Sequence, residues 1–367
     1  MEPYAGADLG DYVVERKVGE GSFGAVWSGL HRDTKERVAL KVLLPAAAAN
    51  HEQVSRFHRE AELLELVRSP NVARMVEFLV DDQFGVVLVM EFIDGELMSE
   101  HLHAGILGVD ETLDLGTQIL DGVADLHEVG IIHRDLKPNN IMLCKNADGS
   151  RRVVIFDLGL SRLVRDTRSD ESTRSLTGSH VALGTLECMA PEQILNARDV
   201  TVRSDVYSVG SILYRAMTGY YPFASEDERD LARRKLTVET PEIVVVSTDA
   251  LAEGMRAIIT KATRRRPAQR YETARSMRND FVALRELAKT RASAVPAKNA
   301  PPRAANVAPD AYPDVTERSA RARMPTLILE DRQPKSSRRE LAVAILVGFS
   351  VFFGLVGLAF AWRALHR

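Results

Sequence analysis

Cysteine is scarce in this sequence of 367 residues, which contains only Cys144 and Cys188. Two isolated cysteines exclude a disulfide-stapled secreted scaffold and a cysteine-rich metal site. We therefore expect the main domain to occupy a reducing, cytosolic compartment. No basic segment followed by an apolar run opens the chain, so we expect no secretory signal peptide.

Strong charge of one sign is also lacking, because the net charge is only −3. This small value averages two unlike segments. Residues 1–287 hold 35 basic and 45 acidic side chains, a net of −10, whereas residues 288–340 hold 11 basic and 6 acidic ones, a net of +5. An acidic main segment argues against a nucleic-acid groove, so nucleic acid is not an expected partner.

The sequence does contain one short stretch, 131–143 (IIHRDLKPNNIML), with apolar ends and a polar middle. The middle brings an imidazole, a carboxylate, two cations and an amide within eight residues: His133, Arg134, Asp135, Lys137 and Asn140. Catalysis requires such groups to be held in fixed positions, and apolar flanks that can be packed provide this. The stretch therefore predicts a rigid catalytic loop.

Three glycines near the N-terminus, Gly19, Gly21 and Gly24, have the spacing G-x-G-x-x-G and are followed by Val26. Glycines let the backbone approach phosphate oxygens because no side chain intervenes. The same spacing occurs at dinucleotide sites and in ordinary turns. A dinucleotide site requires a helix after the third glycine, whereas two β-like runs follow here, 25–30 and 37–44. These runs favour a hairpin over phosphates.

Lys41 lies inside the second apolar run, where an ammonium is costly to bury unless it is paired. It either reaches the surface from a strand end or binds an acidic partner. The next segment, 53–67, has apolar residues at helical spacing and contains two candidate partners, Glu60 and Glu62. We favour Glu60, because Glu62 points to a different helical face.

These features resemble the protein kinase family. The catalytic loop of that family reads H-R-D-L-x-x-x-N, which 131–143 matches at every fixed position. Asp157, Leu158 and Gly159 stand where kinases have D-F-G, with Leu in place of Phe. Ala190, Pro191 and Glu192 stand where they have A-P-E. The resemblance covers about 11–287 and is to the eukaryotic-like serine/threonine protein kinases, particularly their bacterial receptor-type branch.

The resemblance implies an α+β, bilobal protein kinase fold, with a β-rich N-lobe over about 11–93 and a mainly helical C-lobe over about 94–287. The implied catalytic residues are Asp135, Lys137, Lys41, Glu60 and Thr185. The implied ATP contacts are Gly19, Gly21, Ser22, Phe23, Gly24, Val26, Ala39, Lys41, Met90 as gatekeeper, Glu91, Ile93 and Met142. Asn140 and Asp157 are the implied ligands of Mg²⁺, or of Mn²⁺ in its place. Asp205 would anchor the catalytic loop, and Arg270 would pair with Glu192.

The implied activity is transfer of the ATP γ-phosphoryl group to Ser or Thr hydroxyls of proteins, because kinases with a lysine at the position of Lys137 act on these hydroxyls. Arg134 suggests regulation by autophosphorylation of an activation segment, 160–183. Its favoured acceptors are Thr177 and Ser179, followed by Thr173 and Ser175. Cys188 stands where many relatives have tyrosine, and we interpret it as a small buried hydrophobe. Ser204 or Asp205 is also expected to cap the next helix.

Beyond about residue 287 the globular pattern stops. Residues 288–338 hold seven of the 15 prolines, which predicts that 288–340 is a disordered linker whose basic excess can lie against anionic lipid. Residues 341–362 contain no charge. As a helix they would span about 33 Å, enough for a bilayer core of about 30 Å. We expect one transmembrane helix there rather than a buried core helix, with a short tail at 363–367 and no large extracellular sensor.

Lys335, Arg338 and Arg339 precede the apolar run. Together with the need for ATP, they predict a single-pass cell-membrane protein whose kinase domain is cytoplasmic. Small residues on one face of the run, Ser350, Gly354, Gly357 and Ala361, would let two such helices approach closely and form a homodimer.

Two rival functions can be compared with the kinase hypothesis. A pseudokinase that acts as a membrane-bound scaffold would usually lack Lys41, Asp135 or Asp157, and all three are present. A small-molecule phosphotransferase of the aminoglycoside-kinase type would share the fold but lack the A-P-E segment.

Overall fold

A computed structural model of the protein describes residues 2–21, 24–43, 58, 61–157, 183–196, 199–223, 225, 227–244 and 249–294. The chain divides into two compact units, Met1–Ala297 and Lys298–Arg367, and all described residues belong to the first. Several predictions fall outside the described residues. They concern Ser22, Phe23, Glu60, Leu158, the four activation-segment acceptors, the linker beyond residue 294 and the apolar run 341–362.

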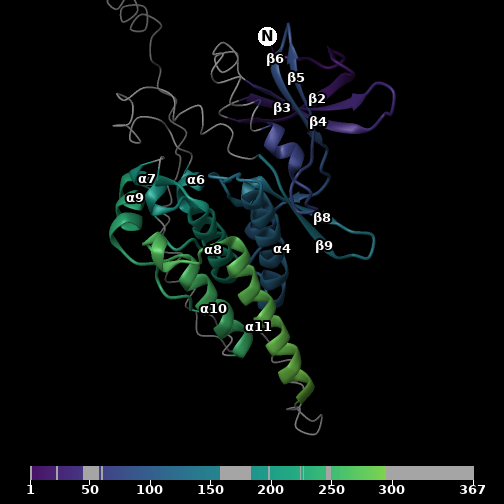
Figure 1. Cartoon of the computed structure of the whole chain (residues 1–367). Coiled ribbons are helices and arrows are strands. Elements are labelled where there is room, and N and C mark those ends of the chain that lie inside the picture. Colours follow the sequence, from purple (N-terminus) through teal and green to yellow (C-terminus); the bar gives the residue numbers. More distant parts are fainter. Residues whose placement is uncertain are drawn as a thin grey trace, which may run out of the picture. The chain divides into compact units, whose positions relative to one another are not determined.

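The N-terminal part of the chain forms a six-stranded antiparallel sheet (Figure 1). Its strands in spatial order are β1 (Asp8–Leu9), β2 (Tyr12–Gly21), β3 (Gly24–His31), β4 (Arg37–Leu43), β6 (Gly85–Glu91) and β5 (Met75–Asp81). Strands β2 and β3 form the predicted hairpin, in which Gly21 lies opposite Gly24.

The C-terminal part is mainly helical, and a small antiparallel sheet precedes most of its helices. The sheet consists of β7 (Glu96–Leu97), β8 (Ile141–Lys145) and β9 (Arg151–Ile155). The α-helices are α3 (Met98–His103), α4 (Val109–Glu128), α6 (Leu183–Cys188), α7 (Pro191–Leu195), α8 (Val202–Thr218), α9 (Glu228–Thr237), α10 (Ala250–Ala262) and α11 (Ala274–Ala294). There are also two 3₁₀ turns, η1 (Pro138–Asn140) and η4 (Pro267–Gln269), and residues 61–66, within the predicted helix 53–67, are helical as well.

Strand β6 shows how the apolar pattern builds the N-terminal part. Successive side chains of a strand point to opposite faces of its sheet. Accordingly, Val86 and Leu88 pack in one apolar cluster, while Val87 and Val89 pack in another on the opposite face. The first cluster also contains Leu126 of α4, so this strand links the sheet to the helical part. A continuous apolar run was needed here because both faces of the strand are covered.

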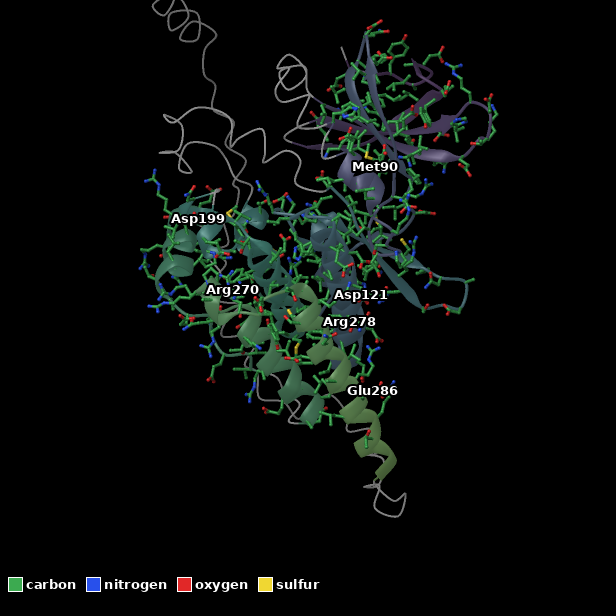
Figure 2. The ribbon with its side chains drawn as sticks, viewed as in Figure 1. Met90, Asp121, Asp199, Arg270, Arg278 and Glu286 are labelled. Carbon is green, nitrogen blue, oxygen red and sulfur yellow. The ribbon has the colours of Figure 1, made fainter. Side chains whose placement is uncertain are left out.

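Helices α4 and α11 pack against each other in antiparallel fashion, and ion pairs follow their contact. Arg278 of α11 donates from Nε to Asp121 of α4 at 2.9 Å (Figure 2). Farther along the two helices, Arg285 pairs with Asp114. Helix α11 continues to Ala294, so the prediction of a disordered linker over 288–340 is wrong for residues 288–294, which are helical. Residues 288–291 include Ala, Lys and Arg, which have high helix propensity.

The start of α8 differs from the sequence expectation. The N-cap is Thr201, whose side chain accepts from the Arg203 N–H, rather than Ser204 or Asp205. Ser204 occupies the third helical position, where its hydroxyl accepts from the Thr201 N–H at 3.2 Å. This reciprocal pair is a capping box. It leaves Asp205 inside the first turn, with its carboxylate available to the catalytic loop.

Among the described residues, no helix is both long enough and apolar enough to cross a membrane. The apolar run 341–362 lies outside those residues.

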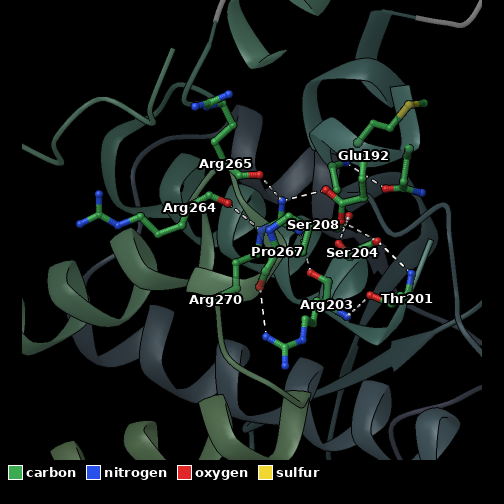
Figure 3. Close-up of polar contacts among 12 residues, drawn as sticks. Glu192, Thr201, Arg203, Ser204, Ser208, Arg264, Arg265, Pro267 and Arg270 are labelled. Atoms are coloured by element: carbon green, nitrogen blue, oxygen red, sulfur yellow. Dashed lines mark hydrogen bonds and ion pairs between the residues drawn. The ribbon is translucent and has the colours of Figure 1, made fainter. Parts of the chain in front are cut away.

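A buried guanidinium joins η4, α7 and α8 (Figure 3). Arg270 binds Glu192 with two hydrogen bonds, Nη1 to Oε1 at 2.7 Å and Nη2 to Oε2 at 2.8 Å. Its other N–H groups donate to the carbonyl oxygens of Arg264, Arg203 and Arg265 at 2.6, 3.0 and 2.9 Å. An arginine has five N–H donors, so every donor of Arg270 is used. The predicted pair with Glu192 is confirmed.

Glu192 receives a third hydrogen bond, from the Ser204 hydroxyl at 2.7 Å. Burial by itself raises the pKa of this carboxyl. The hydrogen bonds and charge of Arg270 outweigh burial, and the pKa of Glu192 lies below its usual value. The carboxylate is therefore charged at neutral pH, and it fixes the position at which α7 meets α8.

We predict that Arg270→Met destabilises the protein by roughly 3–5 kcal/mol, because Glu192 is left buried and unpaired. Urea unfolding of the full chain measures this loss. The double variant Arg270→Met/Glu192→Gln should recover part of it, since the uncompensated charge is gone. Arg233→Met is the matched control, because Arg233 is exposed and pairs with Asp230 on its own helix. A cost no larger than that of the control would contradict the prediction.

Candidate active site

The carboxylate of Asp205 binds the backbone of the loop between α4 and η1. Its Oδ2 accepts from the backbone N–H of His133 at 2.8 Å, and its Oδ1 accepts from that of Arg134 at 3.0 Å. Asp205 is 1% exposed. The predicted role of Asp205 as the anchor of this loop is confirmed. Arg134 needs the anchor because its φ is +63°, in the left-handed region that non-glycine residues seldom adopt.

The imidazole of His127 also stabilises the ionised form of Asp205. His127, at the end of α4, places Nε2 2.8 Å from Oδ2 of Asp205. Burial alone raises the pKa of Asp205, but the contacts with His127 and His133 prevail and hold the pKa below its usual value. The acceptor for the two loop N–H groups is therefore an ionised carboxylate at neutral pH.

The candidate base, Asp135, stands at the start of a connected polar row. Lys137 donates from Nζ to Oδ2 of Asp135 at 2.9 Å and to Oγ1 of Thr185 at 3.1 Å. Asp135 and Lys137 belong to the catalytic loop, whereas Thr185 belongs to α6. The three side chains were predicted as catalytic, and the fold brings them together although 48 residues separate Lys137 from Thr185.

The two candidate metal ligands lie on either side of β8 and β9. Asn140 donates from Nδ2 to the carbonyl oxygen of Asp135 at 2.8 Å. Its amide oxygen accepts no hydrogen bond from any described residue. Asp157, which follows β9, has a φ of +55°, a second left-handed non-glycine residue at this site. Such backbone conformations cost free energy and gather at functional sites.

Lys41 of β4 reaches Asp157 and forms an ion pair with its Oδ1. The lysine is 8% exposed, whereas the Asp157 side chain is 45% exposed. Burial raises the pKa of Asp157, but the charge and hydrogen bond of Lys41 more than offset this, with further help from His133 and Lys137. The pKa of Asp157 therefore lies below its usual value. The predicted partner Glu60 lies outside the described residues.

These groups fit a magnesium ion. A carboxylate and an amide oxygen are ligands that Mg²⁺ prefers, and it commonly takes only one or two protein ligands, with phosphates and water supplying the rest. In the described part of the chain, no group of three His, Cys, Asp or Glu side chains gathers as a metal site. Asp157 and Asn140 would hold such an ion together with phosphate oxygens and water.

A partly open apolar surface adjoins Lys41. Ala39 of β4 lies opposite Met90 of β6, and Val26 of β3 lies opposite Lys41. Residues 39 and 41 share a face of their strand, since side chains alternate. Ala39, Met90 and Val26 are half-buried, whereas Leu40 on the other face is fully buried. An apolar surface of this kind, next to a lysine, suits a flat base with attached phosphates.

The segment after β6 provides backbone groups at the edge of this surface. The Glu91 N–H donates to the carbonyl oxygen of Arg74 at 2.9 Å. The N–H and carbonyl of Ile93 make no hydrogen bond with any described residue, and Ile93 is half-buried. Met142 of β8 is half-buried as well. The hinge role of Glu91 and Ile93 and the adenine contact of Met142 stay predictions.

The glycines of the hairpin differ in how much space a side chain would have at each position. A Cβ on Gly24 would collide with the backbone carbonyl oxygen of Val42 in β4, while a Cβ on Gly19 would meet nothing within 4 Å. Gly24 is therefore required by the close approach of two strands, a reason that the glycine spacing alone did not reveal. Open space beside Gly19 is compatible with the predicted approach of a phosphate group.

Sequence reasoning missed two residues that support the catalytic loop. One is His127, which contacts Asp205 as described above. The other is Gln193, directly after the A-P-E residues, whose Nε2 donates to the carbonyl oxygen of Arg134 at 2.8 Å and whose Oε1 accepts from the Ala190 N–H at 2.9 Å. Its position after a recognised motif was the available signal. Cys188 is buried, as predicted.

Comparisons with known proteins agree with this geometry. A family model described as "Protein kinase domain" matches residues 12–282. The chain is 38% identical over 214 residues to serine/threonine-protein kinase pkn2 of Myxococcus xanthus, covering 58% of this chain and 25% of that protein. It is 31% identical over 276 residues to serine/threonine-protein kinase PknL of Mycobacterium tuberculosis, covering 75% and 66%. It is 30% identical over 273 residues to PrkC of Bacillus subtilis, covering 74% and 40%.

Solved structures give the same fold. The kinase domain of Mycobacterium tuberculosis PknI matches with a TM-score of 0.57 at 23% identity, covering 77% of this chain and 100% of that chain. Rad53 residues 1–466 in complex with AMP-PNP match with a TM-score of 0.57 at 26% identity, covering 74% and 64%. The matched part of the chain thus spans from a quarter to two thirds of the length of the curated relatives named above. It has the bilobal protein kinase fold, and it belongs to the protein kinase family.

Proposed function

We propose that this chain is a serine/threonine protein kinase that transfers the γ-phosphoryl group of ATP to Ser or Thr hydroxyls of proteins. One observation carries the proposal. The row Asp135–Lys137–Thr185 and the pair Lys41–Asp157 supply a candidate base, two cations and a second carboxylate, and the charge of Lys137 also acts on Asp157. The similarity to serine/threonine kinases supports it.

Phosphoryl transfer depends mainly on positioning and on stabilisation of charge. Asp135 would orient the substrate hydroxyl and accept its proton. Lys137, fixed between Asp135 and Thr185, would neutralise negative charge on the phosphoryl group during its transfer. Lys41 would bind the α and β phosphates from the N-lobe side. Asp157 and Asn140 would hold Mg²⁺, which when bound neutralises charge between neighbouring phosphates.

We predict that Asp135→Asn lowers phosphoryl transfer by about 10²–10⁴-fold, the usual contribution of a general base. The assay measures transfer of radiolabelled phosphate from ATP to the purified full chain and to casein. ATP binding should be retained, since Asp135 is not a nucleotide contact. The matched control is Asp148→Asn, a change of the same kind in an exposed turn.

Equal transfer by wild type and Asp135→Asn would refute the assignment of the base. ATP binding without any transfer by wild type would instead favour the pseudokinase scaffold.

Autophosphorylation of the activation segment is part of the proposal. Arg134 follows the buried His133, its backbone is fixed by Asp205 and Gln193, and its guanidinium is a permanent cation. A phosphate on the segment can pair with such a cation and order the segment. We predict phosphate on Thr177 or Ser179, with Thr173 and Ser175 next. Phosphopeptide mapping of active wild type tests this, with Asp135→Asn as the unphosphorylated control. Active protein without phosphate between 160 and 184 would contradict it.

Membrane anchoring through 341–362 is the last part of the proposal. It rests on 22 uncharged residues in succession and on the basic residues before them. We predict that the full chain stays with the membrane fraction after an alkaline carbonate wash, and that deletion of 341–362 releases it. Deletion of 300–321, a stretch of equal length in the linker, is the matched control and should leave the chain in the membrane. Release of the full chain by the wash would argue for a surface contact of the basic linker.

A further inference from the structure

Lys235 of α9 is a buried cation that the proposed chemistry does not use. It is 1% exposed, and no carboxylate among the described residues lies within ion-pair distance of its Nζ. Burial of an ammonium without a counter-ion is costly. A protein that retains such a group must satisfy each of its donors in another way.

Its partners are two backbone carbonyls and an aromatic ring. Nζ donates to the carbonyl oxygens of Glu187 and Met189, each at 2.7 Å. It also lies 4.9 Å from the centroid of the Tyr207 ring. An ammonium has three N–H donors, and these three partners account for them. Lys235 thereby joins α9 to the end of α6 and to α8 (Figure 1).

The two carbonyls occupy a special place, because they lie at and just beyond the C-terminus of α6. The last carbonyls of a helix have no partner within the helix and carry the negative end of its dipole. The carbonyl between them, that of Cys188, accepts from the Ser208 hydroxyl at 3.0 Å. Three successive carbonyls are thus held by side chains of α8 and α9, and the ammonium holds two of them.

Helix α6 leads from this point to the catalytic residues. Thr185, two residues before Glu187, accepts from Nζ of Lys137, which in turn contacts Asp135. The helix spans only Leu183–Cys188, so a shift at its C-terminal end is carried to Thr185 within one turn. We propose that Lys235 is a positioning residue, whose ammonium fixes the end of α6 and so keeps Thr185 and Lys137 aligned with Asp135. This inference rests on the proposed kinase function.

The surroundings of Lys235 make its charge depend on pH. The ionisable groups that face it are Glu187 and Cys188 of α6, Glu192 of α7, Tyr207 of α8 and Arg270. Burial lowers the pKa of Lys235 to about 7, although the negative charge of Glu187 opposes this. Because the pKa is lowered, the group is charged below about pH 7 and loses its charge as the pH rises through that value. Cys188 stays neutral, since burial raises the pKa of its thiol to about 12.

The test compares Lys235→Met, Lys235→Gln and wild type as full chains. Methionine keeps the apolar stem and removes the ammonium, while glutamine supplies two neutral N–H donors. We expect Lys235→Met to lower kcat for casein phosphorylation by about 10- to 100-fold, the range that a misplacement of catalytic groups produces. We expect its KM for ATP to match that of wild type, and Lys235→Gln to recover part of the loss. The matched control, Arg234→Met, changes an exposed neighbour paired with Asp230 and should keep the wild-type kcat.

A purely structural role would give a different pattern. Lys235→Met would then unfold at lower urea concentration while its kcat per folded molecule stayed at the wild-type value, and that result would overturn the proposal. A Lys235→Gln variant no more active than Lys235→Met would overturn it as well. The ratio of wild-type to Lys235→Met kcat should be larger at pH 6.5 than at pH 9, and a ratio that does not fall with pH would contradict the role of the charge.

Failure of the inference can be told apart from failure of the kinase assignment. Amide hydrogen exchange in 185–190 should be faster in Lys235→Met than in wild type or Arg234→Met, whether or not the protein transfers phosphate. No phosphoryl transfer by wild type would refute the proposed function. Unchanged exchange in 185–190 would refute the anchoring by Lys235.

Discussion

The catalytic loop depends on one buried carboxylate. Asp205 accepts hydrogen bonds from two successive backbone N–H groups, those of His133 and Arg134. A left-handed non-glycine residue such as Arg134 costs about 1–3 kcal/mol. A hydrogen bond to a charged group contributes about 1.5–3 kcal/mol. Two such bonds therefore offset the strain, and the loop can keep a conformation that it would not hold alone. The position of Asp135, immediately afterwards, follows from that conformation.

Two further buried charges, those of Arg270 and Lys235, act on other segments of the helical part. Arg270 fixes α7 through Glu192, and Lys235 fixes the end of α6. Both cations also contact the same Tyr207 ring, at 4.8 and 4.9 Å from its centroid. Burial raises the pKa of Tyr207, so the ring stays neutral between them.

Buried ion pairs seldom add stability over apolar packing, because desolvation offsets the attraction between the charges. The charged groups here determine where particular backbone groups lie. A hydrogen bond fixes a backbone group in a definite place, whereas apolar contact tolerates sliding. All three charges act on the segments that contain Asp135, Thr185 and Glu192. The core of the helical part is apolar, and charge is confined to the places where loop geometry decides the position of a reactive group.

The motif residues could be predicted because their chemistry restricts residue type and spacing. The contact of Asp205 with the loop and the Glu192–Arg270 pair are confirmed by hydrogen bonds between the described residues, whereas the catalytic roles of the loop residues stay predictions. Other features were beyond the sequence. The partners of Lys235 and Gln193 include backbone carbonyls, which every residue possesses, so no residue pattern identifies them. The need for glycine at 24 arises from the close approach of β4, a tertiary contact without a local signal.

The end of α11 was missed for a related reason. Apolar periodicity reports where a helix touches the core, and this contact stops before the helix does. Leu287 is already exposed, and the residues just after it include Ala and Lys, which have high helix propensity, so the apolar pattern ends early while the helix continues to Ala294. The N-cap of α8 was misplaced by three residues because Ser204 is a good capping residue that here serves as the partner of Thr201.

Among the described residues of the candidate site, each of two carboxylates has a lysine beside it, and this pairing bears on what the site can bind. Asp135 pairs with Lys137, and Asp157 pairs with Lys41, so each acid has one lysine beside it. Strong net positive charge would hold nucleotide phosphates too tightly for release, and strong net negative charge would repel them. A nucleotide with one bound Mg²⁺ keeps a net negative charge, which the two lysines of these pairs would attract. The ionised state of Asp157, secured by Lys41, keeps a hard oxygen ligand available for that metal at neutral pH.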